Sequence, residues 1–348
     1  MKVLSFGDLH IHSSHYFSKP TRDNYTIRLV EHIDCMKWIA SKILEIKPDV
    51  VDLGGDIFHT QGSIATDTLD AASVCVTIVA DACAEVGAKL IIVVGNHDLL
   101  SNEAEQVHAT KVFKNYKNVA MLVEKSMVID GLAFVPYTKN KDQLARFLME
   151  KGKADVCLSH LDMHGARFHA TMCDEHGVPP NMFTNFKKVI NHHYHLPQTI
   201  QVGDTEIFMP GAPQEWSFRE PKGQVKRGIC LLDTDDWSIV QIENDYSPAF
   251  VICETIDQVL AAKPNDYLMV KVLFENDLKE FREAIGDRRY EVEIEVDRSY
   301  RDVDIGVDRD NLSTTVEEDI RDFVDKVETG EMKKETLLAV GLNMTKNV

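Results

Sequence analysis

The feature that most constrains this chain is a unit repeated in its first hundred residues: a short apolar run that ends in glycine followed by polar or acidic residues. The three runs, with the residues that follow them, are Val3–Phe6 with Gly7-Asp8, 49–53 with Gly54-Gly55-Asp56, and 89–94 with Gly95-Asn96-His97-Asp98. Amphipathic stretches with helical spacing of apolar residues separate the runs. This alternation predicts an α/β fold whose polar chemistry lies at the carboxyl ends of strands.

The rest of the chain predicts a second group of strands and a small appendage. Asp130-Gly131 lies between two apolar runs and indicates a β-hairpin. From Phe186 onward the pattern is mostly strand, and residues 250–296 alternate strands with two helices. We therefore expect a main domain over residues 1–248 and a compact α/β domain over residues 249–300.

The C-terminal residues, 301–348, predict a linker followed by helices. The stretch 302–310 is rich in acidic residues, and an amphipathic helix follows with Val316, Ile320 and Phe323 on one face. A second helix is expected over residues 333–342. Such a pair of helices either belongs to the chain's own fold or docks on a partner protein.

Composition narrows the classes of function. The formal net charge of −18 argues against a protein that grips nucleic acid over a broad surface, because that grip comes from Lys and Arg. The modest basic clusters, which are equally consistent with ordinary surface, are Arg219, Lys222, Lys226, Arg227 and the pair Lys187 and Lys188. No apolar run reaches the roughly 18 residues of a membrane span, and the N-terminus does not resemble a secretory signal. Seven scattered cysteines suggest reduced thiols, so a cytoplasmic location is expected.

Five segments carry an unusual set of oxygen and nitrogen ligands. They are Asp8-Leu9-His10, Gly55-Asp56-Ile57-Phe58-His59, Gly95-Asn96-His97-Asp98, Ser159-His160 and His193-Tyr194-His195. Any one of these motifs is common by chance, but four of them lie at expected strand ends. Residues i and i+2 of a strand point to the same side, so we expect Asp8 with His10, and His193 with His195, to face one cavity.

Such a cavity would offer two carboxylates, one amide oxygen and four imidazoles. This inventory fits two metal ions about 3.5–4 Å apart that share a carboxylate. Cysteine is missing from the set, which disfavours a structural zinc site. Mixed carboxylate, amide and imidazole ligands suit manganese, which we expect, with magnesium, iron or zinc as alternatives.

The ordered set resembles the calcineurin-like metallophosphoesterase superfamily, a two-sheet sandwich flanked by helices. The resemblance implies a first metal held by Asp8, His10, Asp56 and His195. It implies a second metal held by Asp56, Asn96, His160 and His193, so that Asp56 is the bridge. It also implies that His97 donates a proton to the leaving oxygen and that Asp98 orients His97.

A finer resemblance points to the SbcD-type and meiotic-recombination-type DNA repair nucleases, including those of phages. Gly55–His59 is similar to their second motif, in which a histidine at the position of His59 places the phosphate or DNA end. Residues 211–220 resemble another of their segments. The resemblance implies an exonuclease with endonuclease activity, a capping domain over 249–300, and a helical segment within 301–348 that docks on an SbcC-type coiled-coil ATPase. A homodimer is expected on the same ground.

Two positions depart from these nucleases. His192 stands where they usually have glycine before the paired histidines, and His12 stands where they often have glycine after the first motif. His12 and His15 are therefore either substrate contacts or polar loop residues.

Two other functions fit the same motifs. One is a metallophosphatase or nucleotide phosphodiesterase of the superfamily. Phosphoprotein phosphatases usually carry arginine after the second motif and glutamate after Asn-His, where this chain has His59-Thr60-Gln61-Gly62 and Asp98. The other is a scaffold with an inactive metal site, which the complete ligand set disfavours.

Overall fold

The structure is a computed structural model. It describes residues 1–13, 25–102, 107–150, 154–169, 172–215, 217–218, 227–272, 277–288, 290–294 and 324. The chain divides into two units, residues 1–272 with 276–293 and residues 273–275 with 294–348. The expected linker and terminal helices lie outside the described residues, apart from Val324. The domain boundaries expected at residues 248 and 300 stay predictions.

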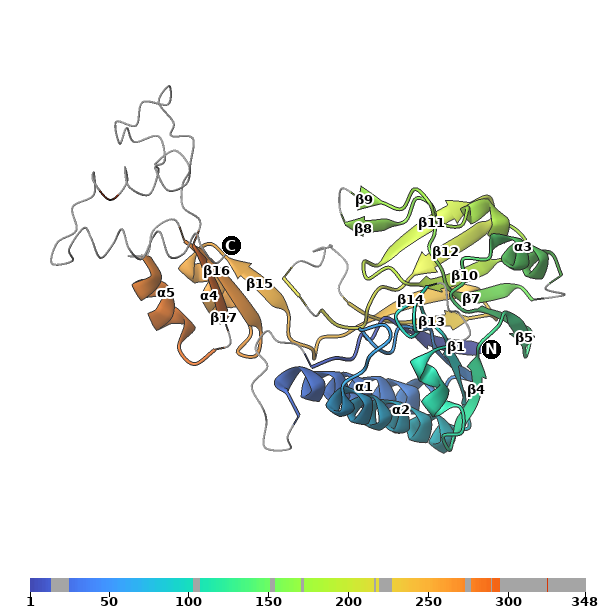
Figure 1. The fold of residues 1–348 in the computed structure, drawn as a ribbon, viewed down its shortest axis with the longest axis horizontal. Helices are drawn as coiled ribbons and strands as arrows, with labels where there is room; N and C mark the ends of the chain where they lie inside the picture. The colour runs from blue at the N-terminus through green and yellow to red at the C-terminus, as the bar shows by residue number, and fades with distance from the viewer. Residues whose placement is uncertain are drawn as a thin grey trace, which may run out of the picture. The chain divides into compact units, whose positions relative to one another are not determined.

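The first large sheet has six strands in the order β14-β13-β1-β2-β3-β4. Their bounds are β1 Lys2–Phe6, β2 Val50–Leu53, β3 Lys89–Val93, β4 Val119–Val123, β13 Gly228–Asp233 and β14 Ser238–Glu243. Strands β1 to β4 are parallel, whereas β13 is antiparallel to β1. Helices α1 (Ile27–Ile46) and α2 (Thr66–Val86) lie side by side next to this sheet (Figure 1).

The second large sheet also has six strands, in the order β11-β12-β10-β7-β6-β5. Their bounds are β5 Met127–Ile129, β6 Leu132–Val135, β7 Val156–His160, β10 Lys188–His192, β11 Gln198–Val202 and β12 Thr205–Met209. Four of them, β6, β7, β10 and β12, are parallel. Smaller elements around the two sheets are η1 Ala109–Phe113, α3 Lys141–Glu150, β8 Arg167–His169, β9 Met172–Cys173 and η2 Pro180–Phe183.

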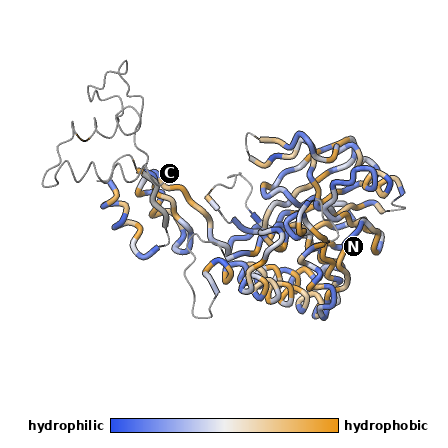
Figure 2. The backbone as a smooth tube through the Cα atoms, in the orientation of Figure 1, coloured by the Kyte–Doolittle hydropathy of each residue, from blue (hydrophilic) through white to orange (hydrophobic). Residues whose placement is uncertain are grey.

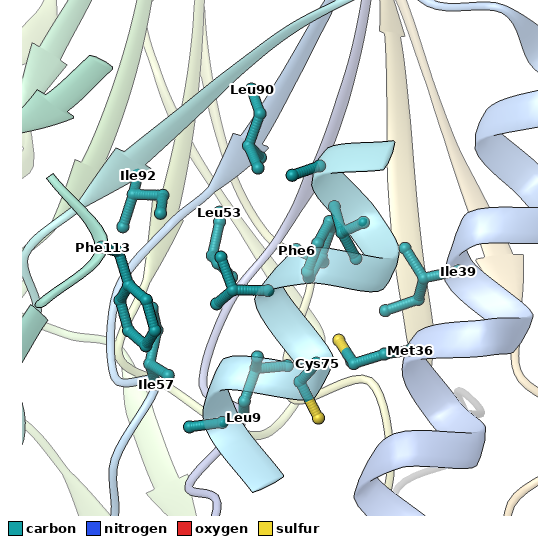
Figure 3. Close-up of a cluster of buried hydrophobic side chains, with 14 of the residues drawn as sticks. Phe6, Leu9, Met36, Ile39, Leu53, Ile57, Cys75, Leu90, Ile92 and Phe113 are labelled. Atoms are coloured by element: carbon teal, nitrogen blue, oxygen red, sulfur yellow. The ribbon is translucent and has the colours of Figure 1, made fainter. Parts of the chain in front are cut away.

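The two sheets pack face to face, and side-chain alternation along each strand builds the layers. In β1, Val3 belongs to the cluster between the sheets, together with Phe134 and Leu158 of the second sheet. Leu4 and Phe6 point the other way, into the cluster that α1 and α2 cover. Figure 3 shows that cluster, and the hydropathy pattern of both helices can be followed in Figure 2. The expected two-sheet α/β sandwich is therefore confirmed.

A third sheet of three strands, β15-β16-β17, follows the sandwich in the chain. Its elements are β15 Phe250–Cys253, α4 Ile256–Ala261, β16 Tyr267–Val272, α5 Leu278–Ile285 and β17 Tyr290–Ile294. Helix α4 begins with a capping box in which Thr255 and Gln258 satisfy each other's backbone N–H groups. The alternation of strands and helices expected over residues 250–296 is confirmed in this described part.

Several smaller predictions also have outcomes. Asp130 and Gly131 both have positive φ and join β5 to β6, so the hairpin is confirmed. Six of the seven cysteines are buried. Among the described residues, no helix combines the length and hydropathy that crossing a membrane requires. The basic pair is neutralised, because Lys187 pairs with Asp155 at 3.2 Å and Lys188 pairs with Glu206.

Candidate metal centre

All seven expected ligands lie at or just after the carboxyl ends of parallel strands. In the first sheet, Asp8 and His10 follow β1, Asp56 follows β2 and Asn96 follows β3. In the second sheet, His160 ends β7, and His193 and His195 follow β10. The centre therefore lies where the carboxyl ends of strands from the two sheets meet, with ligands from both sheets.

One group of side chains joins Asp8, His10 and His195, whose ligand atoms all lie within 4.8 Å of one another. The Nε2 atoms of His10 and His195 are 3.1 Å apart. Both oxygens of Asp8 accept the backbone N–H of His193, at 3.1 Å each. This hydrogen bond ties a ligand of the first sheet to the loop that carries ligands of the second.

A second group joins Asp56, His160 and His193 in the same way. Asn96 lies among them, because its Oδ1 is 3.0 Å from His160 Nε2 and 2.9 Å from His193 Nδ1. Asp56 Oδ2 is 3.3 Å from His160 Nε2. Four potential ligand atoms thus surround one point.

The hydrogen bonds on the far sides of these rings test whether a metal fits. His160 Nδ1 lies 2.8 Å from the carbonyl oxygen of Gly54, which can only accept, so Nδ1 carries the hydrogen. His193 Nε2 lies 2.8 Å from a carboxylate oxygen of Asp162 and donates to it in the same way. The inward nitrogens, His160 Nε2 and His193 Nδ1, both face Asn96 Oδ1, which can only accept. A divalent cation bound at this point would replace any hydrogen on the inward nitrogens and would be held by the amide oxygen and both rings.

Without a metal, ionisation places a proton where a cation would bind. Burial lowers the pKa of His160, but the carboxylates of Asp56 and Asp8 outweigh burial and raise this pKa to about 10. Burial raises the pKa of Asp56, yet His160 and His10 hold it well below its usual range. Burial also keeps the pKa of His10 well below 6.5. The centre thus favours positive charge next to Asp56 and a neutral, ligand-ready His10.

Asp56 lies between the two groups. Its Oδ2 is 3.5 Å from His10 Nε2 as well as 3.3 Å from His160 Nε2, and its Oδ1 accepts the backbone N–H of His97 at 2.8 Å. Gly95 makes room for this carboxylate, since a Cβ there would lie 2.2 Å from Oδ1. One carboxylate oxygen is thus within reach of both ligand groups.

Backbone strain is concentrated at these residues. The φ angles are 54° at Asp8, 47° at His10, 52° at Asp56 and 93° at His193. Non-glycine residues rarely adopt positive φ, and such strain is typical of functional sites. Our expectation that strand alternation aims the paired ligands is wrong, because β1 ends at Phe6 and β10 at His192. Left-handed loop residues turn these side chains inward instead.

His97 and His59 lie beside the first group and form a third set with His10, in which one ligand atom of each residue lies within 4.8 Å of the others. His97 Nδ1 donates a hydrogen bond to the carbonyl oxygen of His59 at 2.5 Å, so Nε2 is the ring nitrogen that this bond does not use. The rings of His97 and His10 are 4.6 Å apart. His59 Nδ1 is 3.3 Å from His10 Nδ1, and its ring stacks on His12 at 4.4 Å. Burial, with His12 and His97, lowers the pKa of His59 to about 4.

Asp98 contacts the loops rather than the ring of His97. Its carboxylate accepts the backbone N–H groups of Gly95, Asp56, Ile57 and Phe58, at 2.9 to 3.2 Å. Burial and the neighbouring Asp56 raise the pKa of Asp98 to about 7. Any orienting effect on His97 therefore passes through the backbone of the second and third motifs.

Comparison with known proteins places the chain in a family. The model of the calcineurin-like phosphoesterases matches residues 1–225. The chain belongs to this family. Members use divalent metals, and the His and Asp groups described above can hold such ions in this phosphoesterase. A search of curated proteins finds no match.

Solved structures similar to this phosphoesterase include an archaeal phosphodiesterase, at 15% identity and a TM-score of 0.33, covering 70% of this chain and 99% of that one. Another is a dimetal phosphatase from Danio rerio, at 10% identity and a TM-score of 0.36, covering 66% and 91%. A third is GAP50, the anchor in the inner membrane complex of Plasmodium, at 11% identity and a TM-score of 0.40, covering 86% and 98%.

Sequence reasoning missed residues of this phosphoesterase that support the ligands. Asp162 holds His193 and accepts a 3.2 Å hydrogen bond from Tyr137. The sequence signal that could have identified Asp162 is its position two residues after His160. Gln61 donates to the carbonyl oxygen of Asn96 at 2.6 Å. His12, one of the two uncertain histidines, lies 2.6 Å from the carbonyl oxygen of His10, whereas His15 lies outside the described residues.

Proposed function

We propose that this phosphoesterase is a two-metal DNA nuclease, the hydrolytic subunit of an SbcCD-like recombination and repair complex. It would cleave phosphodiester bonds at DNA ends, with endonuclease activity at hairpins or single strands. The observation that carries the two-metal part is the position of Asp56 Oδ2, 3.5 Å from His10 Nε2 and 3.3 Å from His160 Nε2. A carboxylate placed there can bridge two ions.

The ligand roles follow from the two groups. Asp8, His10, Asp56 and His195 would hold one ion, and Asp56, Asn96, His160 and His193 the other. When bound, two divalent ions lower the pKa of water towards about 7 and neutralise charge on the phosphate, so that no side-chain base is needed. We expect manganese, because oxygen and imidazole ligands suit it.

The partly exposed histidines indicate where substrate approaches. Asp8, His10, Asp56, Asn96 and His160 are buried, whereas His12, His59 and His97 remain partly exposed. These three rings form a row, His12 on His59 at 4.4 Å and His59 on His97 at 5.8 Å. Cleavage of a phosphodiester leaves an alcohol oxygen that needs a proton. His97 would donate that proton from Nε2, because Nδ1 is held by His59.

DNA as the substrate rests on the sequence resemblance of Gly55–His59 and residues 211–220 to the DNA repair nucleases. With a net charge of −18 the chain itself offers little general attraction for DNA, so bound metals and a partner would supply it. We propose that partner to be an SbcC-type coiled-coil ATPase docked on residues 301–348, with the nuclease as a homodimer in the cytoplasm.

A direct test compares two substrates in the presence of manganese. The proposal predicts manganese-dependent release of nucleotides from duplex ends, with little hydrolysis of a small phosphomonoester. Asp56→Asn serves as the negative control, and Asp155→Asn, an exposed ion-pair change, as the matched positive control. Preferential hydrolysis of the phosphomonoester would favour a phosphatase instead. A chain that hydrolyses neither and binds no manganese would be the inactive scaffold.

A further inference from the structure

Two polar residues stand in the apolar layer between the sheets. Ser5 of β1 and Asp52 of β2 are register partners, and both are fully buried. Alternation puts them on the same face as Val3 and Val50, which belong to the cluster between the sheets. A buried carboxylate is costly unless it is hydrogen-bonded, so this pair needs an explanation.

The explanation is the side chain of His192, which reaches this pair from the second sheet. Ser5 Oγ donates to Asp52 Oδ2 at 2.6 Å and lies 2.8 Å from His192 Nε2. Because the serine hydrogen is used on Asp52, Nε2 must carry the hydrogen that it shares with Ser5 Oγ. The His192 ring thus connects β10 of the second sheet to β1 and β2 of the first through a buried polar chain.

The hydrogen-bonded residues Ser5, Asp52 and His192 lie directly beneath the metal centre. His192 is completely buried, and its Nδ1 points toward Asp8 Oδ2 at 3.8 Å, with no hydrogen-bond partner in the described part of the chain. The ring fills the space over two glycines, since a Cβ at Gly7 or Gly54 would lie 2.8 Å or 2.0 Å from its atoms. Gly7 precedes Asp8, and the Gly54 carbonyl holds His160.

We propose that His192, held by Ser5 and Asp52, is a positioning residue that fixes the spacing between the two halves of the metal centre. This inference rests on the proposed two-metal function. The first sheet carries Asp8, His10, Asp56 and Asn96, and the second carries His160, His193 and His195. His192 is the residue before His193, so the Ser5 contact ties the ligand loop of one sheet to the strand that leads to Asp8 in the other.

The expected consequence is a loss of metal-pair geometry without a loss of substrate binding. Outer residues that orient metal ligands typically contribute roughly 10- to 100-fold to metal affinity or activity. We expect Ser5→Ala and His192→Phe to weaken binding of the second manganese ion by a factor in this range. Because His192 is buried away from solvent, kcat should fall while KM for DNA stays close to the wild-type value.

Rescue by a similar side chain separates positioning from bulk. His192→Gln keeps a donor near the place of Nε2 and should retain manganese affinity, whereas His192→Phe keeps the ring without the donor. Thr205→Val is the matched control for Ser5→Ala, since Thr205 is also buried and donates to the Phe186 carbonyl oxygen at 2.6 Å, in the second sheet.

The experiment titrates each purified full-length chain with Mn²⁺, using electron paramagnetic resonance to detect the exchange-coupled pair. We expect Ser5→Ala to form the manganese pair more weakly than the wild type. Thr205→Val and His192→Gln should form it as the wild type does. Wild-type affinity and spectrum in both Ser5→Ala and His192→Phe would overturn the inference, as would an equal loss in Thr205→Val. If His192→Phe does not fold, Ser5→Ala decides. A wild-type chain that forms no pair would overturn the proposed function as well.

Discussion

The Nε2 atoms of His10 and His195 face each other at 3.1 Å, although these residues follow strands of different sheets. At most one of the two nitrogens can carry a hydrogen between them, whereas a shared cation satisfies both lone pairs. A second cation would in the same way be held by Asn96 Oδ1 and the inward nitrogens of His160 and His193. The centre therefore exists only where the two sheets pack against each other.

Asp56→Asn should affect both ions, since Asp56 Oδ2 lies within 3.5 Å of His10 and of His160. The amide keeps the shape of the carboxylate but loses the charge that a bridge needs. We expect fewer than two manganese ions per chain and activity lowered by about 100-fold or more. Elemental analysis of the dialysed chain gives the stoichiometry. Retention of two ions and of activity would contradict the bridging role.

His97→Ala should separate chemistry from metal binding. His97 bonds to His59 through Nδ1 and bonds Asp56 only through its backbone N–H, which alanine keeps. Both ions should therefore remain, while DNA cleavage falls on the order of 100-fold through loss of the proton donor. Paired measurements of manganese content and cleavage rate check this. Normal cleavage by the variant would remove His97 from the mechanism.

Asp162→Ala tests the support of His193, because alanine removes the acceptor that asparagine would keep. The Asp162 carboxylate accepts from His193 Nε2 at 2.8 Å and fixes the tautomer whose Nδ1 faces Asn96. We expect metal affinity to fall by roughly 10- to 100-fold, the usual effect of losing such a partner. Calorimetric titration with Mn²⁺ measures it, with Asp155→Asn as an exposed control. Equal affinities in the two variants would show that Asp162 is dispensable.

His32 should make stability depend on pH. Its pKa lies well below 6.5, because the ring is buried and stands near Arg28. Below pH 6.5 the unfolded chain therefore binds a proton that the folded chain excludes. Stability falls as pH drops from 6.5 toward the folded pKa, by up to about 1.4 kcal/mol per pH unit.

The check for His32 is urea unfolding between pH 8 and pH 5, in EDTA so that metal binding does not contribute. His32→Gln should lose less stability than the wild type over this range, because glutamine does not titrate. His32 Nδ1 lies 2.7 Å from Gln214 Nε2, and the variant changes this contact as well. The two chains are therefore compared only in the slope of their unfolding free energy against pH, which reports protonation. Parallel curves for the two chains would exclude His32 as the source.

Arg28→Met should destabilise the packing of the small sheet on α1. The Arg28 guanidinium is 2% exposed, pairs with Glu31, and lies 5.2 Å from the ring centre of Phe250 and 5.4 Å from that of Tyr267. Removing one partner of a buried ion pair costs about 3 kcal/mol or more. Lys37→Met, which breaks an exposed pair with Asp34, should cost less than about 1 kcal/mol. Similar unfolding free energies for both variants would contradict this packing.

The positions of many strands along the chain and the candidate ligand residues could be predicted from sequence, because both follow from local patterns. Apolar runs that end in Gly-Asp or Gly-Asn-His identify strand ends, and parallel strands bring their carboxyl ends to one edge. The hairpin at Asp130-Gly131 is equally local. Family resemblance then assigned the ligands to two ions, and this division stays a prediction.

The supporting contacts could not be predicted, because they depend on how the sheets pack. Ser5, Asp52 and His192 are remote in sequence, and only the sandwich brings them together. The positive φ angles of Asp8 and His10 could not be assigned from local sequence, since only a small fraction of aspartate and histidine residues adopt them. Asp98 was expected from the family resemblance to orient His97, yet its carboxylate bonds to the loop backbone.

The account depends on two cations that share Asp56. A crystal soaked in manganese, measured at the manganese absorption edge, tests this directly. We expect two anomalous peaks about 3.5–4 Å apart, one beside Asp8, His10 and His195 and the other beside Asn96, His160 and His193. A single peak, or two peaks of which one lies out of reach of Asp56, would contradict the two-metal centre.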